Sequence, residues 1–154
     1  MCLDSIDNTN LPDIEDEIEA YKVFIQIPDG RLTTVYYTMD GEFLGLRKKR
    51  VIEADKWLRA SDGTICIDKL AKSKCYPCGF HAYKNEEDAE ASVDDAGGFT
   101  IKKVILRGVH TTGAETVWKD SQIAYVPVYV AKEMLVPGIQ QCQKETGRVQ
   151  ENAS

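Results

Sequence analysis

The sequence predicts an α+β fold, in which one or two short helices pack on a mainly antiparallel sheet. Two strand-like runs, 21–28 and 31–38, flank the dipeptide Asp29-Gly30, which is the strongest short-range signal for a β-hairpin. A longer β-rich run covers 123–136. The chain lacks the regular βαβ alternation that builds a parallel sheet, and it has no glycine-rich phosphate loop.

The length and the charge distribution predict three segments. The 154 residues fit one domain that buries a core without help from metal or disulfides. Residues 1–19 hold seven acidic residues and no Lys or Arg, and such arms are usually solvated and mobile. We therefore expect a flexible acidic arm at 1–19, a single α+β domain at 20–138 and a polar C-terminal tail at 139–154.

The composition also excludes some partners. The net charge of −6 belongs to the acidic arm, so the rest of the chain is close to neutral and lacks the strongly basic face that duplex nucleic acid requires. No apolar run approaches the ~20 residues that span a bilayer, so no membrane partner is expected. The first residues have neither the basic nor the apolar region of a secretory signal, which favours a cytoplasmic protein.

The first half of the chain contains further short elements. Asp40-Gly41 marks a second turn after the predicted hairpin. The stretch 44–60 has a mixed period, and a second helix is expected near 50–60. Residues 64–67 are typical of a short strand.

The middle of the chain predicts a strand followed by the more clearly marked helix. Residues 79–84 are strand-like, and 85–93 have the pattern of a short helix. Asn85 is a good N-cap residue, and the acidic first turn suits the helix dipole. The glycine-containing stretch 94–98 is expected to end the helix.

The last part of the predicted domain is β-rich. Residues 99–109 predict a strong strand, 110–115 a turn, and 123–136 the final strand. Pro127 lies inside that final run and therefore indicates an edge or a bulge.

The cysteines raise the question of a metal site. Cys75-x2-Cys78-x2-His81, with Cys66 nine residues earlier, has the residue types of a zinc site. Closed zinc sites usually use two separated pairs, however, and Cys66 lies in a strand-like run where cysteine behaves as a small buried hydrophobe. An odd count of five cysteines does not indicate a disulfide framework. We expect no metal and no other cofactor, with zinc kept as an alternative.

The two histidines are the first candidates for a binding site. His81 and His110 each follow an apolar, strand-like stretch, a common position for ligand contacts. Arg107, a residue type suited to phosphate or carboxylate, lies on the same predicted strand as His110. Gly108 between them indicates either a bulge or the close approach of a ligand. The alternative for each histidine is a hydrogen-bonded structural role.

Aromatic and basic residues extend this site. Tyr36 and Tyr37 end the second predicted strand, and Lys132 and Glu133 point to opposite faces of the last strand, so only one of them faces a site. Aromatic rings beside basic residues suit a nucleobase and its phosphates, although packing is their alternative role. The predicted ligand-binding residues are Tyr36, His81, Arg107, His110 and Lys132.

Several motifs resemble a group of small uncharacterised phage proteins. The shared pattern comprises "YKVF", "YPCGFH", an acidic helix, "VILRGV" and "VYVAKEM", and it covers roughly residues 20–136. A looser similarity is to the ADP-ribosyltransferase fold, in which a late strand carries the catalytic Glu. That resemblance would make Glu133 the catalytic residue, but Tyr21-Lys22 stands where the family has Arg or His, and "GFH" replaces its second motif.

These observations predict a non-catalytic protein that binds a small anionic ligand, with a nucleotide as the leading candidate. The phage resemblance implies sequestration of a nucleotide signal of host defence, in the host cytoplasm. A homo-oligomer is also expected, because sequestering proteins often place pockets between subunits. Two alternatives stay open: an ADP-ribosyltransferase-like or nucleotide-cleaving enzyme, and a protein–protein inhibitor that acts through the acidic arm.

Overall fold

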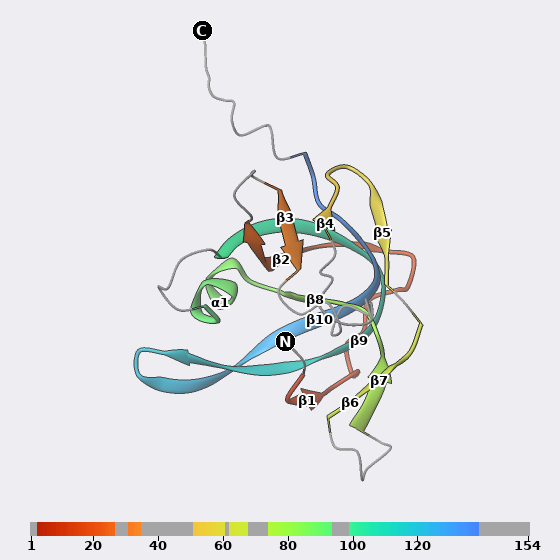
Figure 1. Cartoon of the computed structure of the whole chain (residues 1–154). Helices are drawn as coiled ribbons and strands as arrows, with labels where there is room; N and C mark the ends of the chain where they lie inside the picture. The colour runs from red at the N-terminus through yellow and green to blue at the C-terminus, as the bar shows by residue number, and fades with distance from the viewer. Residues whose placement is uncertain are drawn as a thin grey trace, which may run out of the picture.

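The computed structural model describes residues 3–26, 31–34, 51–60, 62–67, 74–93 and 99–138. These residues form an eight-stranded sheet, a separate two-stranded ribbon and one short helix (Figure 1). Every strand pair among them is antiparallel, which confirms the predicted mainly antiparallel sheet. No helix in this part of the chain is long and apolar enough to cross a membrane.

The longest feature is the hairpin of β9 (Phe99–Lys119) and β10 (Gln122–Leu135). Its turn consists of Asp120 and Ser121, which both have positive φ, as a tight two-residue hairpin turn requires. The two strands confirm the predictions for 99–109 and 123–136. The predicted turn at 110–115 is wrong, because β9 runs through it.

The position of Gly113 explains why a turn at 110–115 was wrongly predicted. A Cβ atom on Gly113 would lie 2.0 Å from the carbonyl oxygen of Ser5, which belongs to the neighbouring strand. The glycine therefore permits a close approach of two backbones rather than a change of direction. Pro127 agrees with the edge alternative and not with the bulge. It pairs in register with Ala114, and the register shift of β10 lies further on, between Val130 and Ala131. Among the described residues, β10 has a strand on its other side only from Val128 onward.

The first half of β9 pairs with β2 (Glu17–Gln26), and the second half pairs with β10. The strand β8 (Phe80–Tyr83) pairs with β10 and meets β2 where Tyr83 lies opposite Tyr21. These pairings join β2, β9, β10 and β8 into a closed ring. The strand β3 (Leu32–Thr34) pairs with β2, which agrees with the predicted first hairpin, while Tyr36 and the Asp40-Gly41 turn lie outside the described residues.

The predicted second helix near 50–60 is wrong. Two short strands occupy this stretch, β4 (Val51–Ile52) on β3 and β5 (Trp57–Arg59) on β10. Asp55 adopts a left-handed conformation with φ of 62° between them, and its N–H donates to the carbonyl of Val136. Pairing with β3 and β10 holds this stretch in strands. These contacts, which are distant in the sequence, override the weak local preference for a helix.

The N-terminal segment is packed on the sheet, so the predicted flexible arm at 1–19 is wrong for residues 3–19. The strand β1 (Ser5–Ile6) pairs with β9, and Leu3 is fully buried. Further along, the N–H of Gly108 donates to the carbonyl of Ile14. The acidic side chains of the segment are all exposed, so their charge reflects solvent contact rather than mobility.

The single described helix, α1 (Glu86–Ala91), confirms the prediction for 85–93 and packs on the sheet through Ala89. Asn85 makes no side-chain bond to the helix backbone and instead donates from Nδ2 to Asp88. Two apolar clusters form the core, one containing Phe80 and Met134 and the other Tyr83 and the residues next to α1. Because β8 lies between them, all four of its side chains are buried.

Candidate functional site

A β-bulge in β9 is the local feature that creates the candidate site. Val130 lies opposite Thr111, and Ala131 lies opposite Val109, so His110 is an extra residue with no opposite partner in β10. Gly108 just before it has φ of 72°, in the left-handed region. A bulge bends its strand and re-aims a side chain, so the sequence-based expectation of a bulge at Gly108 is confirmed.

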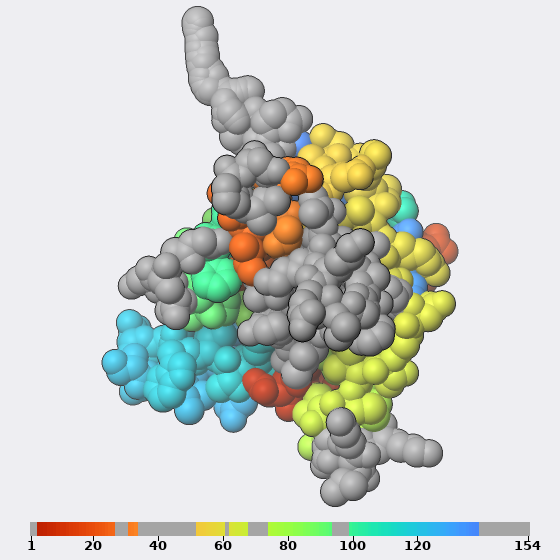
Figure 2. All heavy atoms as spheres, viewed as in Figure 1, coloured from red at the N-terminus to blue at the C-terminus, as the bar shows by residue number. Residues whose placement is uncertain are grey.

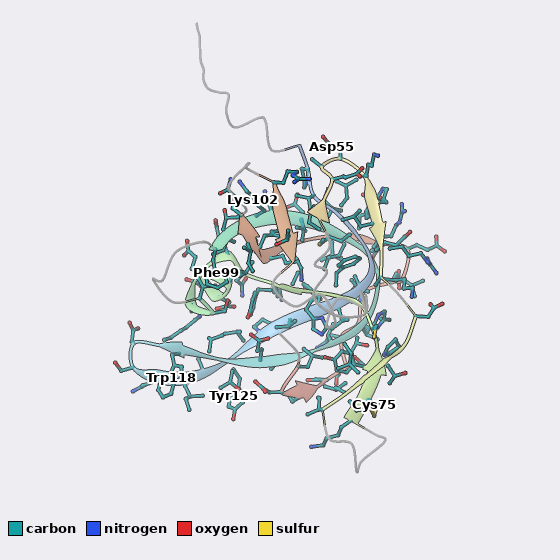
Figure 3. All side chains as sticks on the ribbon, viewed as in Figure 1. Asp55, Cys75, Phe99, Lys102, Trp118 and Tyr125 are labelled. Carbon is teal, nitrogen blue, oxygen red and sulfur yellow. A yellow bond between two sulfur atoms is a disulfide. The ribbon has the colours of Figure 1, made fainter. Side chains whose placement is uncertain are left out.

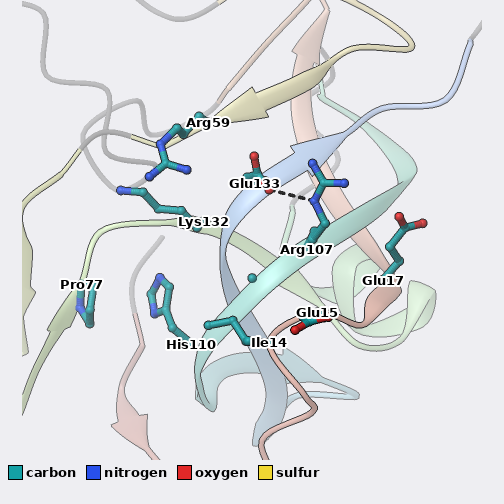
Figure 4. Close-up of a pocket in the computed structure, with 10 residues that line it drawn as sticks. Ile14, Glu15, Glu17, Arg59, Pro77, Arg107, His110, Lys132 and Glu133 are labelled. Atoms are coloured by element: carbon teal, nitrogen blue, oxygen red, sulfur yellow. Dashed lines mark hydrogen bonds and ion pairs between the residues drawn. The ribbon is translucent and has the colours of Figure 1, made fainter.

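The bulge borders an open groove with a volume of about 760 Å³ (Figure 4). Its walls come from β9, β10, β5, the end of β7 (Cys75–Pro77), the start of β2 and the segment before it, which are far apart in the sequence. The residues that line it are Ile14, Glu15, Glu17, Arg59, Pro77, Arg107, Gly108, His110, Lys132 and Glu133.

Two contacts fix the side chain of Arg107 in the wall of this groove. Its Nε donates to Oε1 of Glu133 across the β9–β10 pair at 2.8 Å, and its guanidinium lies 3.9 Å from the ring centroid of Trp57. Glu17 lies opposite Arg107 on the other neighbouring strand, β2. The hydrogen bond that Arg107 donates to Glu133 raises the pKa of Arg107, so this residue is charged at any working pH.

The charges are divided between two sides of the groove. Arg59 and Lys132 lie on one side and Glu15 and Glu17 on the other (Figure 4). Lys132 Nζ donates to Asp62 at 2.8 Å, and this bond lowers the pKa of the Asp62 carboxyl group. The groove therefore has a basic side and an acidic side rather than one uniform sign.

His110 presents a neutral ring to the groove. Its Nε2 lies 3.3 Å from the carbonyl oxygen of Cys78, and its Nδ1 lies 2.8 Å from the hydroxyl of Thr111. The tautomer that satisfies both contacts donates from Nε2 to the carbonyl and accepts at Nδ1 from the hydroxyl. Burial lowers the pKa of His110, so the ring is uncharged near neutral pH.

A two-stranded ribbon, β6 (Thr64–Cys66) and β7 (Cys75–Pro77), supports the groove next to His110. A disulfide joins Cys66 to Cys75 across this ribbon. Cys66 is exposed, so its expected role as a buried hydrophobe is wrong. The cysteine count did not indicate a disulfide framework, and it gave no signal for this one bond. Cys78 is buried, and burial raises the pKa of its thiol.

The ribbon also bears on the alternative of a zinc site. Two of the four candidate ligands, Cys66 and Cys75, are bonded to each other. Within the described ranges, no group of three or more His, Cys, Asp or Glu side chains is placed to hold a metal ion.

His81 lies in the interior, away from the groove. Its Nδ1 donates to the carbonyl of Gly79 at 3.1 Å, and its Nε2 accepts from the hydroxyl of Tyr76 at 2.9 Å. That hydroxyl also accepts the N–H of Leu3, and Lys22 Nζ donates to the backbone carbonyl of His81 at 2.7 Å. Burial, followed by the charge of Lys22, holds the pKa of His81 well below its ordinary value of 6.5.

The structure thus brings three of the five predicted site residues together. Arg107, His110 and Lys132 line one groove, and Glu133 lies beside them. His81 is fully buried elsewhere, and Tyr36 lies outside the described residues.

Sequence reasoning missed other residues at the groove. Arg59 reaches it because β5 pairs with β10, where Arg59 lies opposite Glu133. Glu17 reaches it through the register of β2, and Glu15 through the packed N-terminal segment. The only signal for them in the sequence is their charge next to short β-like runs, which many surface residues share.

Comparison with protein-family models, curated proteins and solved structures finds no match for this chain. The functional proposal therefore depends on the geometry of the groove and on the sequence patterns described above.

Proposed function

We propose that the chain is a non-catalytic binding protein whose groove at the β9 bulge holds a small anionic ligand, with a nucleotide as the leading candidate. One observation carries the proposal: Arg59, Arg107 and Lys132, from three different strands, converge on one open groove next to the neutral ring of His110. Cations from separate strands meet in one place only through the tertiary fold.

The basic side of the groove is suited to an exchangeable anion. One partner of Lys132 is Asp62, whose side chain is 98% exposed, and exposed ion pairs contribute little net stability. A ligand phosphate or carboxylate can therefore replace Asp62 at low cost. Arg59 lies on the same side and offers a planar guanidinium, which binds phosphate and carboxylate through paired hydrogen bonds.

The rest of the groove suits a ring attached to that anion. Its volume of about 760 Å³ lies within the range of small-molecule sites. The uncharged imidazole of His110 provides a flat surface, and Ile14 and Pro77 add apolar contacts. Glu15 and Glu17, on the acidic side, can accept hydrogen bonds from the amino groups of a nucleobase.

The hydrogen bonds at the groove favour binding over catalysis. Both ring nitrogens of His110 are bonded to protein groups, so this residue does not offer a free general base. Glu133, the residue that the ADP-ribosyltransferase resemblance would make catalytic, accepts a hydrogen bond from Arg107. The phage resemblance supports the cellular part of the proposal, which is sequestration of a host nucleotide signal in the cytoplasm.

The test is thermal-shift screening of the full chain against mono-, di- and cyclic nucleotides. A ligand at 100 times its dissociation constant stabilises the folded state by about 2.7 kcal/mol. The shift should be lost in Arg59→Ala and Lys132→Ala. It should remain in Lys103→Ala, which removes an exposed lysine that lies outside the groove, on the part of β9 that pairs with β2.

Two results would contradict the proposal. No shift with any nucleotide would rule out the leading ligand, and a shift that survives in both groove variants would place the ligand elsewhere. Formation of a product that depends on Glu133 would favour the enzyme alternative instead.

A further inference from the structure

The free end of the β9–β10 hairpin has an open edge. The strand β10 pairs with β8 and β5 from Val128 onward, and residues 122–127 have no strand on that side within the described part of the chain. Figure 2 shows the free end of this hairpin projecting from the molecule, at the left of the view. The N–H of Lys84 donates to the carbonyl of Pro127, so the carbonyl of Pro127 points to this outer side.

The direction of that carbonyl determines the rest of the edge. Backbone groups alternate along an antiparallel strand, so the N–H and C=O groups of Tyr125 and Ile123 also point outward. The segment therefore offers two donors and two acceptors to another strand. Its five residues 122–126, QIAYV, include no charged side chain.

The other edge of the same hairpin is covered as far as Thr116. The N–H of Thr116 donates to the Asp4 carboxylate at 2.6 Å, and β1 pairs with the residues before it. Soluble proteins usually protect exposed edges in such ways, with charges or covering segments. Among the described residues, no such charge or segment covers the edge of β10 at 122–126.

One face of the hairpin end is also apolar and exposed. The exposed fractions are 66% for Trp118, 55% for Ile123 and 72% for Tyr125. Trp118 lies directly opposite Ile123, and Figure 3 shows Trp118 and Tyr125 on the side of the hairpin that faces away from α1. The other face carries Val117 and Val126, which are buried in the core cluster next to α1.

We propose that residues 122–126 pair in an antiparallel manner with the same segment of a second copy of this chain. A two-fold axis at Ala124 places Ile123 of each copy opposite Tyr125 of the other. The outward N–H and C=O groups then form four hydrogen bonds, and two aromatic–β-branched pairs form on the apolar face. The uncharged edge brings no like charges together, and Ala124 leaves room at the axis, so the segment is complementary to itself.

The expected dimer is weak. Each copy contributes a five-residue edge and three large apolar side chains, which is less than the ~800 Å² per partner of a typical stable complex. We therefore expect dissociation on dilution, with a dissociation constant in the range of about 1 to 100 µM. This inference is independent of the ligand groove.

The first test is sedimentation velocity of the full chain over concentrations spanning that range. Ile123→Lys, which adds an edge charge, should weaken dimerisation at least about tenfold. Phe99→Lys makes the same change at an exposed apolar residue at the other end of β9 and should leave dimerisation unchanged. A chain that stays monomeric, or a dimer that persists in Ile123→Lys, would overturn the proposal.

The second test determines the register of the proposed pairing between the two copies of β10. At the two-fold axis the Cα atoms of Ala124 in the two copies would lie about 4.5 Å apart, within reach of a disulfide. Ala124→Cys should therefore form an intermolecular cross-link on mild oxidation. In the same register the two Gln122 residues are roughly 13 Å apart, so Gln122→Cys should form no such cross-link. Equal cross-linking in both variants, or in the unsubstituted chain, would refute this pairing.

Discussion

The two histidines of this chain occupy opposite environments, although both follow strand-like apolar stretches. His81 is fully buried, and both of its ring nitrogens bind groups fixed by the fold. His110 is partly exposed, on a bulge that borders the open groove. The difference arises because β8 is covered on both faces, whereas the bulge turns His110 towards the groove.

This comparison assigns His81 to the stability of the fold and His110 to the proposed binding of a ligand. The Tyr76 hydroxyl between His81 and Leu3 connects the central strand β8 to the ribbon and to the N-terminal segment. The same segment supplies Ile14 to the groove wall. The interior network therefore helps to fix the segment that forms one wall of the groove, whereas the groove residues lie at the surface that a ligand can reach.

The largest expected effect is the loss of the His81 ring. His81→Ala leaves a cavity and removes the acceptor of the Tyr76 hydroxyl, so we expect the free energy of unfolding to fall by about 3 kcal/mol. Urea denaturation of the full chain measures this change. At urea concentrations below the unfolding transition, the folded His81→Ala variant should bind nucleotide with unchanged affinity.

The matched change at the other histidine should give the opposite pattern. His110→Ala removes a partly exposed ring, and we expect it to lower the free energy of unfolding by less than about 1 kcal/mol. The nucleotide-dependent thermal shift should decrease in this variant. Equal destabilisation by the two substitutions would contradict the contrast between the two sites.

A pH dependence of stability should follow mainly from His81. Its folded-state pKa lies well below 6.5, so the unfolded chain binds a proton below that pH when the folded chain does not. The free energy of unfolding should therefore be constant above the ordinary pKa and fall below it, by up to about 1.4 kcal/mol per pH unit. Denaturation at about pH 7.5 and about pH 5.5 tests this expectation.

The control for this prediction is a variant without the ring. His81→Phe should reduce the difference between the two pH values, while His110→Asn, which removes a smaller downward pKa shift, should reduce it less. Burial raises the pKa of Glu115, so its neutral form contributes stability that is lost as pH rises. This opposite contribution is common to all three chains and cancels when they are compared. An unchanged pH dependence in His81→Phe would contradict the assignment.

Local patterns predicted much of the fold. The strands at 99–109 and 123–136 are marked by runs of β-branched residues, and the strand at 79–84 contains two aromatic residues. The helix at 85–93 is marked by an N-cap residue type and an acidic first turn. The strands within 51–59 have no such signal, because their conformation depends on pairing with β3 and β10. The acidic composition of the N-terminal segment predicted exposure correctly, but it carried no information about the burial of Leu3.

The site was partly predictable because some of its residues lie on strands that local patterns predict. Arg107, His110 and Lys132 lie on two long strands that pair with each other, so sequence position almost suffices to bring them together. Arg59 reaches the groove only through the register of β5 against β10. The burial of His81 likewise depends on partners outside its own strand, including Leu3, 78 positions earlier in the sequence, which binds the same Tyr76 hydroxyl.

An effect smaller than that of losing the His81 ring is expected at Gly108, which shapes the bulge before His110. Its φ of 72° disfavours residues with a Cβ atom, and an added Cβ would lie 3.3 Å from that of Lys132. Gly108→Ala should therefore lower the free energy of unfolding by about 1 kcal/mol, and Gly108→Asn by less, because asparagine tolerates the left-handed conformation better. Equal losses would assign the cost to crowding against Lys132 rather than to backbone strain. Urea denaturation of both variants decides between these causes. If the bulge aims His110 at the ligand, the thermal shift with nucleotide should also decrease more in Gly108→Ala than in Gly108→Asn.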